Sequence, residues 1–121
     1  MAADPVLAYD RPDVDALVHD TVKDFGGVTN WVYAANDVGL RGWLIASSVQ
    51  VDVRASSRAA AWQRAEAVRR TLCDLPSVPW DGGVVTRVNV LEGPQWLPDP
   101  DGAPRFVARY EFIAHPTQKR R

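Results

Sequence analysis

Four segments of the chain alternate apolar and polar residues with the two-residue period of a strand buried on one face. They are residues 28–35, 42–54, 84–91 and 106–114. The clearest is 42–54, whose apolar side carries Trp43, Ile45, Ser47, Val49, Val51 and Val53. Turn-forming residues separate the first two segments, and a long connection separates the last two. We therefore expect two antiparallel hairpins, the first with one dry and one solvated face.

Two other segments repeat apolar residues every three or four positions, which is the period of an amphipathic helix. The first has Asp10 or Asp13 as its cap and ends at Gly26-Gly27. The second has Ser56 or Ser57 as its cap. Its apolar stripe comprises Ala61, Ala65, Val68, Leu72 and Leu75. The order α-β-β-α-β-β predicts an α+β fold in which a mixed or antiparallel four-stranded sheet carries both helices on one face.

The length of 121 residues fits one domain. Residues 13–116 carry the periodic segments, so we assign them to the domain, residues 1–12 to an N-terminal arm and residues 117–121 to a basic C-terminal tail. No apolar run reaches the roughly 18–20 residues that a bilayer helix needs, and the acidic N-terminus does not resemble a secretory signal. These features predict a soluble protein with no membrane partner.

Charge is segregated along the chain although the formal net charge is only −1. Residues 1–24 hold six aspartates against Arg11 and Lys23, whereas residues 54–70 hold five arginines against Glu66. A near-neutral total argues against a dedicated nucleic-acid-binding protein. Opposite charges on one small chain favour docking to copies of itself or to neighbours. The alternative is that acidic and basic helix faces meet within one monomer.

Few residues in the sequence offer catalytic or metal-binding chemistry. His19 and His115 stand outside any ligand-spaced motif, and Cys73 lies near the end of a helix, where a thiolate is not favoured. Asp99 and Asp101 lack the further oxygen ligands of a calcium loop, so turn capping is the simpler interpretation. We predict no catalytic residue, no cofactor and no metal.

Tryptophan is the residue type that most indicates an interaction surface. Trp80 and Trp96 lie in loop-like segments, whereas Trp31, Trp43 and Trp62 fit core positions. Trp96 belongs to a predicted loop over residues 93–105, and loops of this length in compact domains tend to be functional. Tryptophan and arginine are preferred anchors of protein interfaces. Trp96 is therefore either an interface anchor or a staple that folds back over its own hairpin.

The element order and the loop together resemble the tail terminator proteins of long-tailed, siphovirus-type bacteriophages. The resemblance spans roughly residues 13–116. It rests on four segments: Ala61-Trp62-Gln63-Arg64-Ala65-Glu66-Ala67-Val68-Arg69-Arg70-Thr71-Leu72, Thr86-Arg87-Val88-Asn89-Val90, Gly93-Pro94-Gln95-Trp96-Leu97-Pro98-Asp99 and Arg105-Phe106-Val107-Ala108-Arg109-Tyr110. The arm and the basic tail have no counterpart in that family.

The resemblance implies a structural, non-enzymatic virion protein, assembled in the host cytoplasm and located at the neck of the tail. Such a subunit closes into a hexameric ring on the major tail tube protein, ends tube polymerisation and presents a surface to the head-tail connector or stopper protein. Genome DNA passes through the ring without sequence-specific binding. Closure into a ring requires a heterologous interface, in which one face of a subunit fits a different face of the next.

The predicted interface uses the loop and the charged helices. Its candidate residues are Trp96, Leu97, Arg105, Arg58, Arg69, Arg70, Asp13 and Asp20. Two alternatives remain open at this point. One is another head-tail connector or head completion protein with the same outline. The other is a small α+β ligand-binding or enzymatic domain that uses Arg87, Arg109, Glu111 and His115 on the open face of the sheet.

Overall fold

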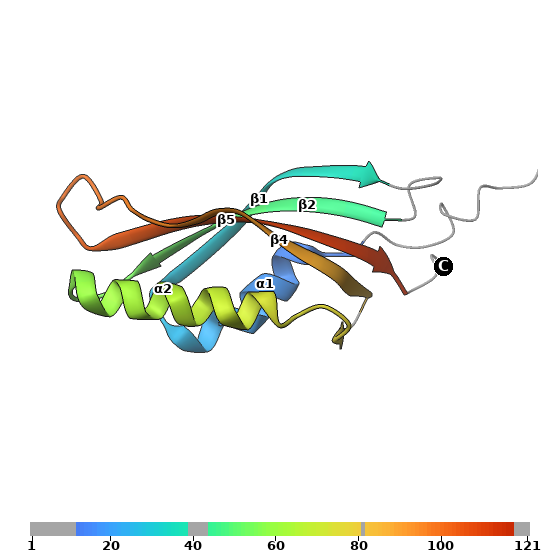
Figure 1. Cartoon of the computed structure of the whole chain (residues 1–121), viewed down its shortest axis with the longest axis horizontal. Coiled ribbons are helices and arrows are strands. Elements are labelled where there is room, and N and C mark those ends of the chain that lie inside the picture. The colour runs from blue at the N-terminus through green and yellow to red at the C-terminus, as the bar shows by residue number, and fades with distance from the viewer. Residues whose placement is uncertain (1–11, 39–43, 81, 118–121) are drawn as a thin grey trace, which may run out of the picture.

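A five-stranded antiparallel sheet, curled into a half-barrel, forms the body of the protein, and both α-helices lie on one of its faces (Figure 1). The computed structural model describes residues 12–38, 44–80 and 82–117. The elements in chain order are α1 (Val14–Val22), the 3-10 turn η2 (Lys23–Phe25), β1 (Val28–Val38), β2 (Leu44–Arg54), α2 (Arg58–Cys73), β3 (Pro79–Trp80), β4 (Gly83–Trp96) and β5 (Arg105–Pro116). The strand order across the sheet is β1-β2-β5-β4-β3.

The predicted four-stranded fold is wrong, because the sheet contains a fifth strand. β3 follows α2 and pairs with the start of β4 through Pro79–Val84 and Trp80–Gly83. A strand of two residues is too short to produce an alternating pattern. Proline is also tolerated as the first residue of an edge strand, where its missing N–H breaks no ladder. The order α-β-β-α-β-β therefore omits one strand.

The two helices begin at side-chain caps and bury the stripes that the sequence predicts. Asp13 accepts a hydrogen bond from the Ala16 N–H at 3.0 Å, and Ser57 accepts one from the Ala60 N–H at 3.1 Å. α1 continues into η2 and stops at Gly26 and Gly27, which both have positive φ. α2 buries Ala61, Ala65, Val68 and Leu72. None of the helices in the described ranges is long and apolar enough to cross a bilayer.

The core lies between the helices and the central strands β2 and β5. In the antiparallel register Val49 faces Tyr110 and Val51 faces Ala108, and all four side chains are buried. Phe112 is fully buried in the same layer. The helix-free face of the sheet carries polar and charged residues along β2 and β5, as expected for a sheet covered on one side.

β4 is longer than predicted, and the β4–β5 loop is correspondingly shorter. The strand reaches Trp96 through three register shifts, between Val85 and Arg87, between Val90 and Glu92, and between Glu92 and Gln95. Each shift breaks the two-residue alternation, so the sequence pattern ends at Leu91 although the strand continues. The predicted loop 93–105 is thus reduced to residues 97–104.

Only small parts of the predicted arm and tail fall within the described residues. Pro12 is buried, and its Cβ lies 3.0 Å from the point that a Cβ on Gly83 would occupy. Thr117 donates its backbone N–H to the Gly82 carbonyl at 3.2 Å. Residues 1–11 and 118–121 lie outside the described ranges.

Candidate protein interface

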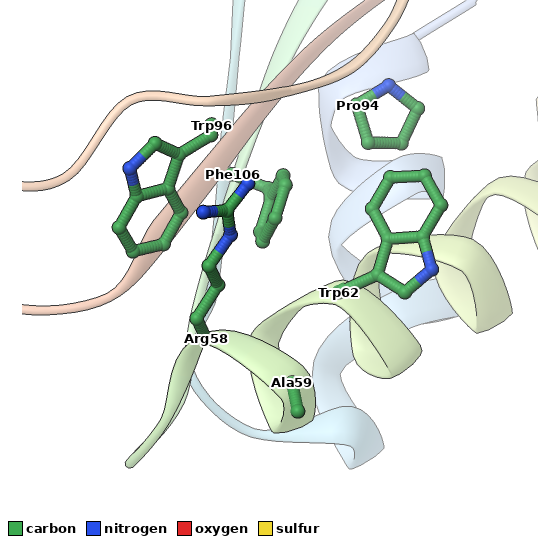
Figure 2. A pocket seen from close by; sticks show the side chains of 6 residues that line it. All are labelled: Arg58, Ala59, Trp62, Pro94, Trp96 and Phe106. Carbon is green, nitrogen blue, oxygen red and sulfur yellow. The ribbon is translucent and has the colours of Figure 1, made fainter.

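An apolar groove opens at one end of the molecule, between the start of α2, the end of β4 and the start of β5 (Figure 2). Its volume is about 730 Å³. We call it the tryptophan groove. It is lined by Arg58, Ala59, Trp62, Pro94, Trp96 and Phe106. The lining therefore combines two indoles, a phenyl ring and a single charged group.

Aromatic contacts hold the walls of the groove in place. Phe106, which is buried, lies 5.3 Å from Trp96 and 5.4 Å from Trp62 between ring centroids, with both pairs tilted by 59°. Such tilted pairs add about 0.5–1.5 kcal/mol to the free energy gained by burial. Trp62 remains 45% exposed and Trp96 37% exposed. The two indoles are thus fixed by their neighbours and still present surface to a partner.

Arg58 is the charged group of the groove. Its Cζ lies 4.8 Å from the centroid of the Trp96 ring, and Figure 2 shows its side chain extending from the start of α2 toward Trp96 and Phe106. In the described part of the chain Arg58 has no ion pair. A cation at the first helical position opposes the positive end of the helix dipole, and the first turn of α2 contains no acid. Arg58 therefore does not stabilise its own helix electrostatically.

Beside the groove, four charged residues form an ion cluster that fixes the β4–β5 loop. Arg54 binds both carboxylate oxygens of Asp99, with Nε–Oδ2 at 2.8 Å and Nη2–Oδ1 at 3.2 Å. Arg105 contacts Asp99 at 3.4 Å and Asp52 at 3.2 Å, and it donates to the Leu97 carbonyl at 2.8 Å. The hydrogen bond from Arg54 is the main reason why the pKa of Asp99 lies below its usual value. The cluster holds the loop, and with it the rim of the groove, against the sheet.

The structure brings four of the eight predicted interface residues to this end of the molecule. Trp96 and Arg58 line the groove, while Leu97 and Arg105 stand at the adjoining loop. Leu97 is 52% exposed, and its N–H donates to the Arg105 carbonyl at 3.0 Å. Arg105, by contrast, is occupied by Asp52 and Asp99. Through these contacts Arg105 holds the β4–β5 loop in position.

The other four predicted interface residues lie elsewhere on the helices. Asp13 is the cap of α1, and Asp20 lies 3.9 Å from Lys23. Arg69 pairs with Glu66 at 2.9 Å. The hydrogen bond from Arg69 to Glu66 raises the pKa of the arginine. Arg70 is exposed on α2.

Trp96 shows features of both interpretations given to it. The ring packs on Phe106 within its own hairpin, as a staple does, and it also borders an open groove, as an anchor does. Trp80 lies in β3 and packs partly buried against the core, so its loop assignment is wrong. Trp31 and Trp62 are exposed at 51% and 45% and are not core residues. Trp43 lies outside the described residues.

The polar residues of the ligand-binding alternative lie on the helix-free face, where Asn89 links Arg87 to Glu111. Arg87 donates to Asn89 at 2.9 Å, and Asn89 donates to Glu111 at 2.9 Å. Arg109 stacks over Tyr33 at 5.4 Å and lies 3.6 Å from Glu92. None of these residues lines the tryptophan groove.

The remaining candidates for chemistry are separated from one another. Burial raises the pKa of the Cys73 thiol, which disfavours a reactive thiolate. Asp101 accepts a hydrogen bond from the Ala103 N–H at 3.0 Å, as in a turn, whereas Asp99 belongs to the ion cluster. Within the described ranges, no three histidine, cysteine or acidic residues converge as metal ligands.

Sequence comparison adds no family assignment to the chain. Its sequence matches no protein-family model, and no curated protein shows significant similarity to it.

Proposed function

We propose that the protein is a non-enzymatic virion assembly protein, a tail terminator of a long-tailed bacteriophage. In this proposal copies of the chain form a hexameric ring on the tail tube, end polymerisation of the major tube protein and join the tail to the head-tail connector at the neck. The observation that carries the proposal is the tryptophan groove. Its exposed indoles, and Arg58, which has no ion pair with any described residue, are the residue types of an interface anchor.

A second surface of opposite character supports association between copies. The exposed side of α1 and η2 carries four aspartates and one lysine: Asp13, Asp15, Asp20, Asp24 and Lys23. The groove lies at the start of α2, where Arg58 is the charged group. Two different complementary surfaces on one chain are what a heterologous, ring-closing contact requires.

The sheet offers two long edges as well. Among the described residues, β1 has 11 residues and pairs with β2 alone. The 14 residues of β4 pair with β3 only through Gly83 and Val84 in the same ranges. Long edges in monomeric proteins are normally covered or interrupted, because they pair readily with other chains. Exposed Trp31 and Tyr33 lie on β1. These edges support side-by-side packing of subunits.

Charge pairing on the helix-free face is compatible with passage of DNA. Arg54, Arg105 and Arg109 each have a carboxylate within 3.6 Å. Guanidinium groups that are already paired bind phosphate weakly, whereas several free ones would hold DNA strongly at moderate salt. A surface of this kind suits a channel through which DNA slides.

The test is to add the purified protein to polymerising tail tube protein and to measure tube lengths by electron microscopy. We expect capped tubes of limited length, with a ring of the added protein at one end. Trp96→Ala is expected to reduce capping at least ten-fold, because truncation of an interface tryptophan typically costs about 2 kcal/mol or more of binding. Its circular dichroism spectrum is expected to match that of the unchanged chain.

Val78→Ala is the matched control, since Val78 is exposed and stands away from the groove. It is expected to cap tubes normally. Unfolding of Trp96→Ala would show that the tryptophan is a staple and not an anchor. A ring that binds heads but leaves tubes uncapped would assign the protein to the head-tail connectors instead.

A further inference from the structure

The tryptophan groove is complementary to a partner that supplies negative charge together with apolar side chains. Arg58 and the N-terminus of α2 both place positive charge at its mouth, and the first turn of α2 has no acid. The walls are the two indoles and Phe106. A complementary occupant therefore carries a carboxylate next to large apolar side chains.

One segment of this chain has that composition. Residues 4–10 read Asp-Pro-Val-Leu-Ala-Tyr-Asp, with three large apolar residues between two carboxylates. Of the other residues outside the described ranges, 39–43 and 118–121 contain arginine or lysine and no acid, and Asp81 is a single residue that supplies no apolar side chain. The exposed side of α1 is acidic but presents no large apolar residue. Charge and hydrophobicity together select the N-terminal segment.

The length of the chain excludes occupation of a subunit's own groove. Pro12 packs at Gly83, the first residue of β4, whereas Pro94 and Trp96 lie near its last residues. A strand of 14 residues spans about 35–40 Å after allowance for its bulges. Leu7 lies five positions before Pro12 and can reach at most about 18 Å from it, and Asp4 lies eight positions before Pro12 and can reach at most about 29 Å. Residues 4–10 can therefore fill this groove only in another copy.

We propose that residues 4–10 of one copy bind the tryptophan groove of the adjacent copy, with their apolar side chains against the indoles and a carboxylate beside Arg58. This contact is directional, because each subunit gives an arm at one end and receives an arm at the other. The arm of the adjacent copy is thus the partner of the groove. The inference rests on the proposed function in one respect, which is that the head-to-tail series of subunits closes into a ring.

Cysteine cross-linking of the full chain tests the contact directly. In a Cys73→Ser background, Leu7→Cys is combined with Ala59→Cys, which lines the groove, or with Arg70→Cys, which is exposed about 16 Å further along α2. Under mild oxidation we expect a ladder of disulfide-linked multimers for the Ala59→Cys pair, at least ten-fold above that for the Arg70→Cys pair. Equal ladders, or cross-linked monomers alone, would overturn the inference.

A second measurement needs no added cysteine. Arg58→Glu reverses the charge at the groove and is expected to weaken self-association at least ten-fold in sedimentation equilibrium. Asp74→Lys, a charge reversal at the exposed C-cap of α2, is expected to leave self-association unchanged. Equal effects of the two substitutions would count against the arm as the occupant.

Tube capping separates this inference from the proposed function. A ladder from the Ala59→Cys pair without capped tubes would support the arm contact and reject the tail terminator. Capped tubes without that ladder would support the terminator and overturn the arm contact.

Discussion

Asp99 connects the β4–β5 loop to the body of the sheet through two arginines at once. Arg54 comes from β2 and Arg105 from β5, and each contacts the carboxylate within 3.4 Å. The pKa of Asp99 is lowered chiefly by the hydrogen bond from Arg54. The two arginines stabilise the ionised carboxylate in the folded protein, and the unfolded chain offers no such contacts. Ionisation of Asp99 therefore stabilises the fold.

This linkage has a defined sign and pH window. Because the pKa of Asp99 is lower in the folded state, its ionisation contributes stability at pH values above the unfolded-state pKa of about 3.9. This contribution is lost as the pH falls through the folded-state pKa. Between pH 6 and pH 3 the unchanged chain is therefore expected to lose more unfolding free energy than Asp99→Asn, as measured by urea denaturation. At pH 7 the variant is expected to be the less stable of the two.

Asp101→Asn is the control for this prediction. Asp101 is exposed and caps a turn through Ala103, and asparagine retains the accepting oxygen. Its pH dependence is expected to follow that of the unchanged chain. A parallel pH dependence in Asp99→Asn would remove Asp99 as the source of the effect.

Among the elements, the central strand β5 and the outer strand β4 differ in what they contribute to stability. Phe112 on β5 is fully buried, whereas Val90 on β4 is 43% exposed. Phe112→Ala is expected to cost about 3–5 kcal/mol of unfolding free energy, because it leaves a cavity in the core. Val90→Ala is expected to stay within about 0.5 kcal/mol. Comparable losses in urea denaturation would contradict this division.

The sequence predicted those elements whose pattern is regular. Asp13 and Ser57 were among the predicted caps, and the stripe from Ala61 to Leu72 is buried as expected. β3 escaped prediction because it is too short to show a period. The end of β4 escaped it because three register shifts break the alternation.

The candidate site was predictable only in part, because contacts between segments that are distant in the sequence leave no local pattern. Arg58 and Trp96 were chosen for their residue type, and the fold brings them together. Trp62 was assigned to the core because it stands next to a buried alanine in a regular helix, and only the position of β4 decides which side of that helix remains open. The Asp52–Arg105 pair spans 53 positions, which no local pattern reveals.

Across the molecule, Pro12, the last residue of the arm, and the tryptophan groove lie at opposite ends of β4, so the subunit has two unlike ends. Pro12 marks one end and Trp96 the other. A contact between unlike ends leaves one free arm and one free groove after each addition, and growth stops only when a ring closes. A reciprocal exchange of arms between two copies would stop at the dimer instead.

Mixing a variant that has a damaged arm with a variant that has a damaged groove tests whether the subunits associate head to tail. Leu7→Asp damages the arm and Trp62→Asp damages the exposed wall of the groove, and native mass spectrometry is expected to find each monomeric where the unchanged chain forms rings. Their equimolar mixture is expected to yield heterodimers only. One intact arm then occupies one intact groove, while the arm and the groove that remain free are both damaged. Rings in the mixture, or an unchanged chain that stops at the dimer, would show that the subunits do not associate head to tail.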